Sequence, residues 1–248
     1  MTAPVVLITG ALAGIGRATA LAYAREGARL MVSGRNDDAG QTLAAELRDL
    51  GAEAQFLRVD VRHDEELREL VDRTVARFGR LDVAVNSAGT EGNRAPVTEQ
   101  TAETYASVFD TNVLGILLSM KHELRVMQKQ GSGSIINLSS TLGHRASPAA
   151  SLYVASKHAV EGLTKAAALE AAAFGVRVNA VAPGPIETAM LNRFTGTAEK
   201  KAGLVAGVPL KRVGTPDEIA QAILFLGSEK ASFVTGHILS ADGGKIAV

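Results

Sequence analysis

Short apolar runs alternate along the chain with longer segments in which apolar residues recur every three or four positions. This alternation of strand and helix patterns indicates βαβ units and a parallel sheet. The short runs are almost continuously apolar, as expected of strands that helices cover on both faces. We predict strands near Val5–Thr9, Ala28–Ser33, Ala54–Val59, Leu81–Asn86, Ser134–Ser139, Val176–Ala182 and Ile238–Ser240.

The longer segments between these strands predict helices with recognisable ends. Several are followed by a glycine, which tolerates positive φ, and Thr215-Pro216-Asp217-Glu218 has the pattern of a helix start. The fold class is therefore α/β, with a Rossmann-type, doubly wound, parallel seven-stranded sheet and helices on both faces. The predicted helices lie near Ile15–Glu26, Asp38–Leu50, Asp64–Phe78, Thr101–Gln130 (broken near Thr111), Ser151–Phe174 and Pro216–Leu226.

Residues 183–213 form the one long stretch without a clear period, rich in Gly, Pro, Thr and Lys. Long irregular segments inside compact domains usually serve as lids or binding loops. We predict that this segment is a substrate lid, with a helical insert near Ala189–Ala202 and with Met190 touching the substrate. Because no linker, repeat or low-complexity tract divides residues 1–248, we expect a single domain.

Three glycines, Gly10, Gly14 and Gly16, stand between the first predicted strand and an amphipathic helix. Glycine lets the backbone turn tightly and approach a pyrophosphate, whose negative charge is favoured by the free N–H groups at the helix start. At the first strand-to-helix turn of a doubly wound sheet, this pattern predicts a dinucleotide-binding loop.

Tyr153 and Lys157 are four residues apart in a predicted helix, so their side chains lie on one face. A phenol with its ordinary pKa of about 10 is a poor proton acceptor at neutral pH, and we expect the Lys157 ammonium to lower that pKa. Hydride transfer at an alcohol or ketone carbon requires a proton acceptor or donor at the oxygen. Tyr153 is therefore the candidate acid/base.

Ser140 follows the predicted strand Ser134–Ser139 and should reach the carboxyl edge of the sheet, where ligands bind. We expect its hydroxyl to hydrogen-bond the substrate oxygen and to hold that oxygen near Tyr153. Ser139 is the nearer alternative, but strand alternation points it the other way. His144 lies between Ser140 and Tyr153 in sequence and is a candidate for lining the substrate pocket.

Composition narrows the classes of partner. Lys and Arg number 26, as do Asp and Glu, and no long run of either sign suggests nucleic acid. Cysteine is absent, which excludes disulfides and thiolate chemistry and fits a reducing, cytoplasmic location. The apolar stretches are too short for a membrane span, and the five histidines show no metal-binding spacing. We expect a small-molecule substrate, no membrane partner and no metal.

Several segments in order along the chain resemble the short-chain dehydrogenase/reductase family. Three residues separate Gly10 from Gly14, as in that family, and Asn86-Ser87-Ala88-Gly89 resembles the family's Asn-Asn-Ala-Gly segment, with Ser87 departing from it. Further matches are Asp60 after the third strand, Pro183-Gly184-Pro185-Ile186-Glu187-Thr188, and the closing Asp242-Gly243-Gly244.

The resemblance implies a catalytic set of Asn112, Ser140, Tyr153 and Lys157. In it Asn112 breaks a helix and holds a water of the proton relay, and Lys157 also grips the nicotinamide ribose. Asp60 would lie near the adenine ring, and the segment from Pro183 to Thr188 would hold the nicotinamide carboxamide. The cofactor-binding residues implied are Gly10, Leu12, Gly14, Ile15, Gly16, Arg35, Asp60, Val61, Asn86, Ala88, Gly89, Tyr153, Lys157, Pro183, Gly184, Ile186 and Thr188.

The end of the second strand usually distinguishes NAD from NADP, through an acidic residue on the ribose 2′-hydroxyl or a basic residue on the 2′-phosphate. Here Gly34 stands where an NAD-preferring relative has Asp, and Arg35 follows it. We therefore expect a preference for NADP, with NAD as the alternative, because Ala13 is not the basic residue of many NADP-binding relatives. Arg35 stacked on adenine, or simply solvated, is the competing interpretation.

The resulting hypothesis is an NAD(P)-dependent oxidoreductase acting on a secondary alcohol or ketone. Two alternatives stay open: a 3-oxoacyl-thioester reductase, which needs a basic surface for an acyl carrier, and a non-catalytic NAD(P)-binding regulator. Arg145 and Lys200-Lys201 are too few to decide the first, and intact Tyr153 and Lys157 argue against the second. The small residues of the helix that carries Tyr153, together with the resemblance, predict a homotetramer.

Overall fold

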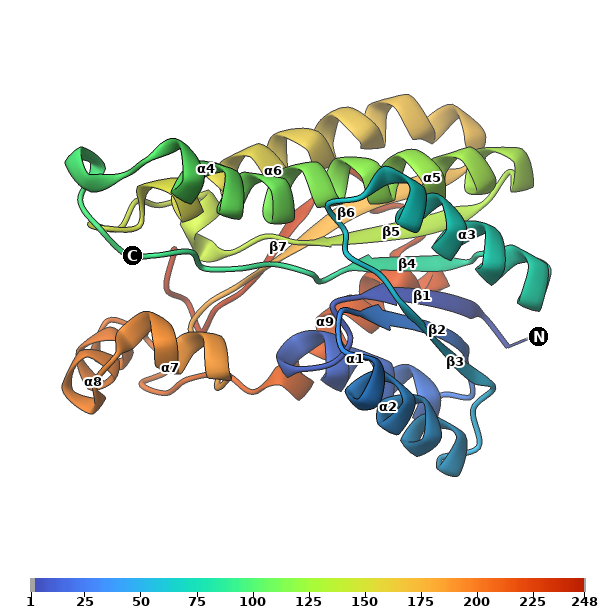
Figure 1. Cartoon of the computed structure of the whole chain (residues 1–248), viewed down its shortest axis with the longest axis horizontal. Coiled ribbons are helices and arrows are strands. Elements are labelled where there is room, and N and C mark those ends of the chain that lie inside the picture. Colours follow the sequence, from blue (N-terminus) through green and yellow to red (C-terminus); the bar gives the residue numbers. More distant parts are fainter. Residues whose placement is uncertain (1–2, 248) are drawn as a thin grey trace.

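Seven strands form the central sheet of the computed structural model, which describes residues 3–247 (Figure 1). Their order is β3-β2-β1-β4-β5-β6-β7, and every pair of neighbours is parallel. The predicted parallel seven-stranded sheet is thus confirmed. The strands are β1 (Val5–Thr9), β2 (Arg29–Gly34), β3 (Ala54–Arg58), β4 (Val83–Asn86), β5 (Gly133–Leu138), β6 (Val176–Pro183) and β7 (Ile238–Ala241).

Helices cover both faces of the sheet, as the doubly wound prediction requires (Figure 1). One face carries α1 (Gly14–Arg25), α2 (Asp37–Asp49) and α9 (Pro216–Gly227). The other carries α3 (Asp64–Phe78), α4 (Ala102–Phe109), α5 (Gly115–Gln130) and α6 (Ser151–Ala171). Short 3-10 turns, η1, η3, η4 and η5, occupy Val97–Glu99, Thr141–Gly143, Ala172–Phe174 and Glu229–Ala231. None of the described helices is both long and apolar enough to cross a membrane.

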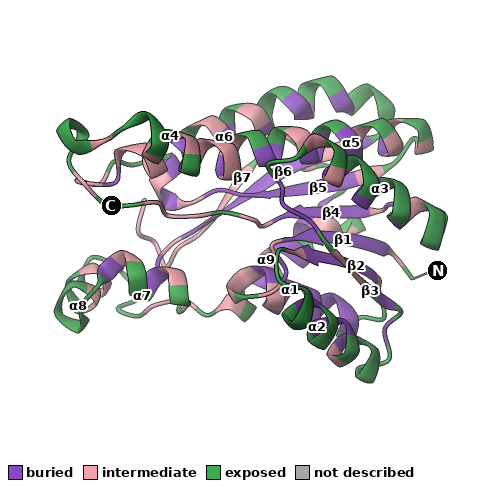
Figure 2. Ribbon diagram, in the orientation of Figure 1, coloured by how far each residue is buried: buried purple, intermediate pink, exposed green. Residues whose placement is uncertain are grey.

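Each buried strand contributes side chains to two separate hydrophobic cores, because successive side chains point to opposite faces of a sheet. Leu7 packs with the helices α3, α5 and α6, whereas its neighbour Ile8 packs with α1, α2 and α9. The same alternation divides Met31 from Val32 on β2. Figure 2 shows the strands buried between helices whose outer faces are exposed. This explains why the strands are continuously apolar in sequence.

The strand order reverses between β1 and β4, so that the connections leave these neighbouring strands in opposite directions across the sheet. Such a switch point opens a crevice outside the carboxyl ends of the strands, and ligands of doubly wound folds bind there. The loops after β1, β4, β5 and β6 meet at this edge and carry most of the predicted site residues.

The predicted helix Thr101–Gln130 is interrupted, as expected, near Thr111. The interruption is a π turn, η2 (Asp110–Leu114), which joins α4 to α5. π turns are rare and concentrate at functional sites. The predicted helix Ser151–Phe174 ends earlier, since α6 stops at Ala171 and continues only as η4.

The predicted helical insert near Ala189–Ala202 is confirmed, although it consists of two helices and extends to Ala206. They are α7 (Ala189–Thr195) and α8 (Ala198–Ala206), which lie apart from the other helices at the left of Figure 1. Gly196 breaks the pattern with a φ of 73°, and the Thr197 side chain then caps α8 by accepting from the Lys200 N–H. A left-handed residue followed by a threonine cap ends one helix and starts the next.

Candidate active site

The glycine loop after β1 leaves a bare backbone surface. A Cβ on Gly16 would lie 2.3 Å from the Gly10 carbonyl oxygen, and one on Gly10 would lie 2.6 Å from the Ala88 backbone. At the start of α1, Ala13 contributes no side-chain cap, and the first turn, which is fully described, holds no acidic residue. The helix start therefore offers unscreened N–H groups, which fits the binding of a pyrophosphate.

Two side chains border this loop. The Thr188 methyl lies 3.3 Å from the position of a Gly14 Cβ, so the segment after β6 meets the glycine loop directly. Leu12 packs so closely on Gly34 that a Cβ at position 34 would lie 2.6 Å from it. Ile15 packs against the core beneath. An acidic side chain at position 34 would therefore require Leu12 to move.

The segment Pro183–Thr188 forms the far wall of the crevice. Pro183 ends β6, and Gly184 approaches Asp242 so closely that a Cβ would lie 2.7 Å from its Cα. Ile186 is buried and pairs with Gly214 in an isolated bridge. Thr188 then caps α7 by accepting from the Leu191 N–H at 3.2 Å.

Asp60 lies at the end of the third strand, where the adenine was expected. Its carboxylate accepts from the Arg62 guanidinium, at 2.6 Å from Nη2, and this contact lowers the Asp60 pKa to about 2. Arg35 is exposed and adds to the lowering from a greater distance. Val61 packs on Gly115 at the start of α5.

Asn86, predicted to bind the cofactor, turns its side chain away from the crevice. Its Nδ2 donates to Glu123 Oε2 on α5 and to Asn137 Oδ1 on β5, both at 3.0 Å. The next residues do reach the edge: Ala88 lies on Gly10, and a Cβ on Gly89 would lie 3.8 Å from Lys157 Nζ. The side chain of Asn86 thus links β4 to α5 and β5 and does not enter the crevice.

Tyr153, Lys157 and Ser140 come together at the carboxyl end of β5. Lys157 Nζ lies 5.6 Å from the centre of the Tyr153 ring and donates to the Leu138 carbonyl at 2.7 Å. The Ser140 side chain lies near enough to the Tyr153 hydroxyl to act on the Tyr153 pKa, and its Oγ accepts from the Leu142 N–H at 3.1 Å. The helical spacing of Tyr153 and Lys157 and the strand position of Ser140 explain this meeting.

The predicted lowering of the Tyr153 pKa by Lys157 is wrong for this structure. Burial raises the pKa of Tyr153 to about 12; the Ser140 side chain opposes this rise, and Glu91 adds to it. Burial also lowers the pKa of Lys157 to about 8, against a raising effect of Glu161. Desolvation disfavours the charged form of both groups and is the largest cause of each shift.

Asn112 lies in the π turn and fastens three elements together. Its Oδ1 accepts from the Thr90 N–H at 2.8 Å, and its Nδ2 donates to the Thr90 carbonyl at 2.9 Å. Nδ2 also reaches Ser156 Oγ at 3.1 Å on α6. The side chain is fully buried and holds the loop after β4 against α6.

The two candidate substrate residues differ in setting. His144 follows η3 and turns Nδ1 toward Glu161 Oε2 at 3.4 Å, so one ring nitrogen faces α6. Met190 is half-buried in the first turn of α7. Met190 therefore lies on the predicted lid segment, whereas the Nδ1 atom of His144 faces Glu161 on α6.

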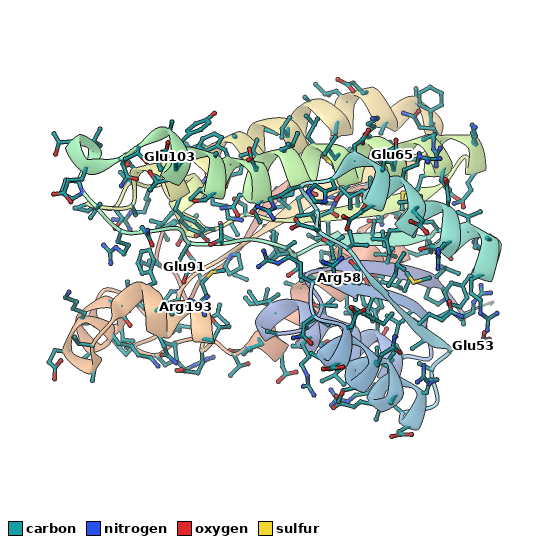
Figure 3. The ribbon with its side chains drawn as sticks, viewed as in Figure 1. Glu53, Arg58, Glu65, Glu91, Glu103 and Arg193 are labelled. Atoms are coloured by element: carbon teal, nitrogen blue, oxygen red, sulfur yellow. The ribbon has the colours of Figure 1, made fainter. Side chains whose placement is uncertain are left out.

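Glu91 and Arg193 lie in segments expected to contact the substrate, Glu91–Pro96 and Pro185–Ala206, but no sequence pattern indicated that they face each other between the loop after β4 and α7 (Figure 3). Arg193 Nε donates to Glu91 Oε1 at 2.5 Å. Beside them Arg94 lies over the Phe194 ring, 4.3 Å from its centre, and donates to the Phe194 carbonyl. A cavity of about 960 Å³ lies between these contacts and α8, with Lys200 on its wall.

Known proteins resemble this chain over almost its whole length. The profile of the family described as enoyl-(acyl carrier protein) reductase matches residues 10–245. The A-factor type gamma-butyrolactone 1'-reductase (1S-forming) of Streptomyces virginiae is 43% identical, over 98% of this chain and 96% of that protein. The cis-4-hydroxycyclohexanecarboxylate dehydrogenase of Sinomonas cyclohexanicum is 41% identical (98% and 97%). The 3-oxoacyl-[acyl-carrier-protein] reductase of Thermotoga maritima is 38% identical (98% and 97%).

Solved structures agree. Levodione reductase superposes with a TM-score of 0.96 at 35% identity, covering 99% of this chain and 98% of the other. ElxO with NADP bound gives 0.92 at 35% identity, covering 100% of both chains. NAD+-bound xylitol dehydrogenase gives 0.93 at 34% identity, covering 97% and 98%. The chain belongs to the short-chain dehydrogenase/reductase family.

Proposed function

We propose that Tyr153 is the acid/base of this NAD(P)-dependent oxidoreductase, whose hydride transfer interconverts a secondary alcohol and a ketone. The observation that carries the proposal is the meeting of Tyr153, Ser140 and Lys157 at the sheet edge, next to the glycine loop. This arrangement unites a proton carrier, a hydroxyl that can hold the substrate oxygen, and a cation beside the dinucleotide crevice.

The nicotinamide, when bound, supplies or accepts the hydride. In reduction, the Tyr153 phenol donates its proton to the substrate oxygen as negative charge develops there, while the Ser140 hydroxyl holds that oxygen. The raised Tyr153 pKa keeps the phenol protonated near neutral pH, which is the form that donates. In oxidation, the substrate hydroxyl gives its proton to the phenolate form of Tyr153, which becomes more populated as the pH rises.

The crevice fits the family's dinucleotide, because its glycine loop has neither side-chain bulk nor acidic charge where phosphates would lie. Gly10, Gly14 and Gly16 would hold the pyrophosphate by backbone N–H groups. We assign the nicotinamide end to Pro183, Gly184, Ile186 and Thr188, and the adenine end to Asp60, Val61 and Arg35. Asn86 would act through Ala88 and Gly89 rather than by its own side chain.

We infer a preference for NADP. Arg35 is exposed after β2, and an acidic residue at position 34, which would bind a 2′-hydroxyl, would require the Leu12 side chain to move. The guanidinium is suited to a phosphate, with which it can make paired hydrogen bonds.

Tyr153→Phe tests the acid/base assignment. The phenylalanine keeps the ring but has no proton to give, so we expect turnover to fall by about 1,000-fold or more, while the NADPH Kd changes little. Tyr105→Phe, at an exposed position of α4, is the matched control and should leave turnover unchanged. Substantial turnover by the Tyr153 variant would remove that residue from the proton-transfer role.

Residues 183–213 are proposed as the substrate lid of a single-domain enzyme. In support, α7 and α8 border the cavity, and the Arg193–Glu91 pair ties α7 to the loop after β4. A panel of cyclic ketones, hydroxysteroids, sugars and acyl thioesters, followed by nicotinamide absorbance, would identify the substrate class. The relatives act, by their names, on a hydroxycyclohexanecarboxylate and on a gamma-butyrolactone, so cyclic substrates come first.

The 3-oxoacyl-thioester reductase is the second candidate, and the Thermotoga relative favours it. The basic residues that an acyl carrier would need are partly engaged: Arg145 donates to the Lys245 carbonyl, and Lys201 donates to Glu187. Turnover of an acyl thioester in the same panel would raise this candidate above the first.

We also propose a homotetramer, because exposed apolar side chains lie on α4, α5 and α6. They are Tyr105, Leu117 and Leu169. Light scattering should give about four times the mass of one chain, and a monomeric mass would contradict the proposal. A cytoplasmic location stays a prediction.

A further inference from the structure

Helix α6 binds the end of β5 at three successive turns. Tyr153 lies near Ser140, Lys157 donates to the Leu138 carbonyl, and Glu161 accepts from the Ser139 hydroxyl at 2.8 Å. Residues four apart on a helix share a face, so these three side chains form one polar line along the inner side of α6. The first two belong to the proposed chemistry. Glu161 has no assigned role.

The Glu161 carboxylate is held in a site built around it. Its side chain is only 6% exposed, and its second oxygen lies 3.4 Å from His144 Nδ1. A Cβ on Gly143 would lie 2.1 Å from Oε1, so the carboxylate rests directly on the backbone of η3. A buried carboxylate is costly unless it has hydrogen-bond or charged partners. Ser139 and His144 provide such partners, both on the segment that carries Ser140.

Glu161 also faces the buried cation of the active site. It lies one turn beyond Lys157, and its charge raises the Lys157 pKa against the effect of burial. The remaining groups around this pair are Tyr153 on α6, His144 after η3, the Leu138 carbonyl on β5, and Asn112 on the π turn beside Gly89. A second carboxylate, Glu91 on the loop after β4, acts on Tyr153, whereas Glu161 is the carboxylate that acts on Lys157.

We propose that Glu161 is a positioning residue of the active site, whose carboxylate fixes the Ser139–His144 segment on α6 and places a negative charge one helical turn from Lys157. The proposal rests on the proposed roles of Tyr153 and Lys157. Glu161 touches neither substrate nor cofactor; it acts through Ser140, which its neighbour Ser139 orients, and through the charge on Lys157. Sequence position alone would class it as one more residue of an amphipathic helix.

Glu161→Gln separates the charge from the shape. Glutamine still accepts from Ser139 but lacks the negative charge, so Lys157 should lose its proton at lower pH. We expect the alkaline limb of the kcat/KM profile to move down by about one pH unit. Glu170→Gln is the matched control, since Glu170 is exposed on the same helix and undergoes the same chemical change. Its profile should stay in place.

Ser139→Ala supplies a second comparison. It removes one hydrogen bond to the carboxylate and keeps the charge, so it should lower kcat through the displaced Ser140 without moving the alkaline limb. A purely structural role for Glu161 predicts the reverse: both variants lower the activity, and neither shifts the pH profile. That result would overturn the proposal.

A titration independent of turnover keeps the test valid if no substrate is turned over or if Tyr153 proves not to be the acid/base. The Nζ signal of Lys157, labelled with 15N and assigned with Lys157→Arg, reports its protonation directly by NMR. We expect its midpoint to fall by about one pH unit in Glu161→Gln. If that variant fails to fold, Glu161→Asp, which withdraws the carboxylate by one methylene, should give a smaller shift in the same direction. An unchanged midpoint in a folded variant would disprove the proposal.

Discussion

The two halves of the sheet present different surfaces to the same crevice. The half formed by β1, β2 and β3 ends in bare backbone, where Gly10 and Gly16 leave no side chain between the loop and its surroundings. The half formed by β4, β5 and β6 is accompanied by buried polar side chains of α6 and the π turn, among them Lys157, Glu161 and Asn112. The first surface is shaped by glycines, which have no side chains, and the second by buried polar and ionisable side chains.

The difference implies two kinds of sensitivity. A backbone surface tolerates changes of pH but not the addition of a carbon atom, because the neighbouring backbone cannot move aside. A buried polar surface tolerates substitutions of similar shape but responds to pH, because its groups titrate at shifted values. An added side-chain atom should therefore disrupt the first half, whereas a change of charge should disrupt the second.

The largest effect is expected from Gly16→Ala. The new methyl group would lie 2.3 Å from the Gly10 carbonyl oxygen, so the loop must open. We expect the NADPH Kd, measured by fluorescence titration, to rise by about 100-fold. In the control Gly203→Ala, within α8, the added Cβ would meet nothing within 4 Å, and the Kd should not change. A wild-type Kd in the Gly16 variant would remove the contrast between the halves.

An intermediate effect is expected at Glu123, whose side chain is fully buried under Asn86. Burial raises the Glu123 pKa from 4.5 to about 8. The native protein thus keeps a proton that the unfolded chain releases near pH 4.5, and stability from this group falls as pH rises through that interval. The cost is complete above about pH 8.

Glu123→Gln removes this titration and keeps an acceptor for Asn86 Nδ2. Its amide can also donate to Asn86 Oδ1, which is buried without a hydrogen-bond partner among residues 3–247. We expect the variant to exceed the wild type in free energy of unfolding by a few kcal/mol at about pH 9, and by much less at about pH 5. Urea unfolding at both pH values measures this difference. Equal differences at the two would show that Glu123 is ionised in the folded protein throughout.

The smallest effect is expected from Arg35→Ala, at the exposed rim of the backbone half. Losing a guanidinium from the 2′-phosphate should lower kcat/KM for NADPH by roughly tenfold and leave that for NADH unchanged. Arg17→Ala, on the outer face of α1 and paired with Glu46, serves as the control. Equal losses with both cofactors would favour stacking of Arg35 on adenine instead of phosphate binding.

Sequence reasoning succeeded where the information was local. The glycine loop is defined by spacing within one turn, and Tyr153 with Lys157 by spacing within one helix, so both could be placed before any fold was known. The direction of Asn86 was also available: on β4 it shares a face with Ala84, which packs toward α5, and alternation would have turned it away from the crevice. The family resemblance instead implied that Asn86 contacts the cofactor.

The remaining features depend on tertiary packing. Glu91 and Arg193 are 102 residues apart, and Ser139 and Glu161 are 22 apart, without any periodic pattern that pairs them. The sign of the Tyr153 pKa shift was missed for a related reason. Spacing shows that a lysine is near, whereas the amount of protein that encloses both groups depends on every neighbouring loop.

The two hydrogen bonds between Asn112 and the main chain of Thr90 make the side-chain amide a substitute peptide group. It pairs with Thr90 as a residue of an adjacent strand would, one donor and one acceptor held at fixed separation. Aspartate has the same outline but no donor, and glutamine is longer by one methylene. The two bonds thus fasten the π turn to the main chain of the loop after β4, and neither replacement could make both of them with the same geometry.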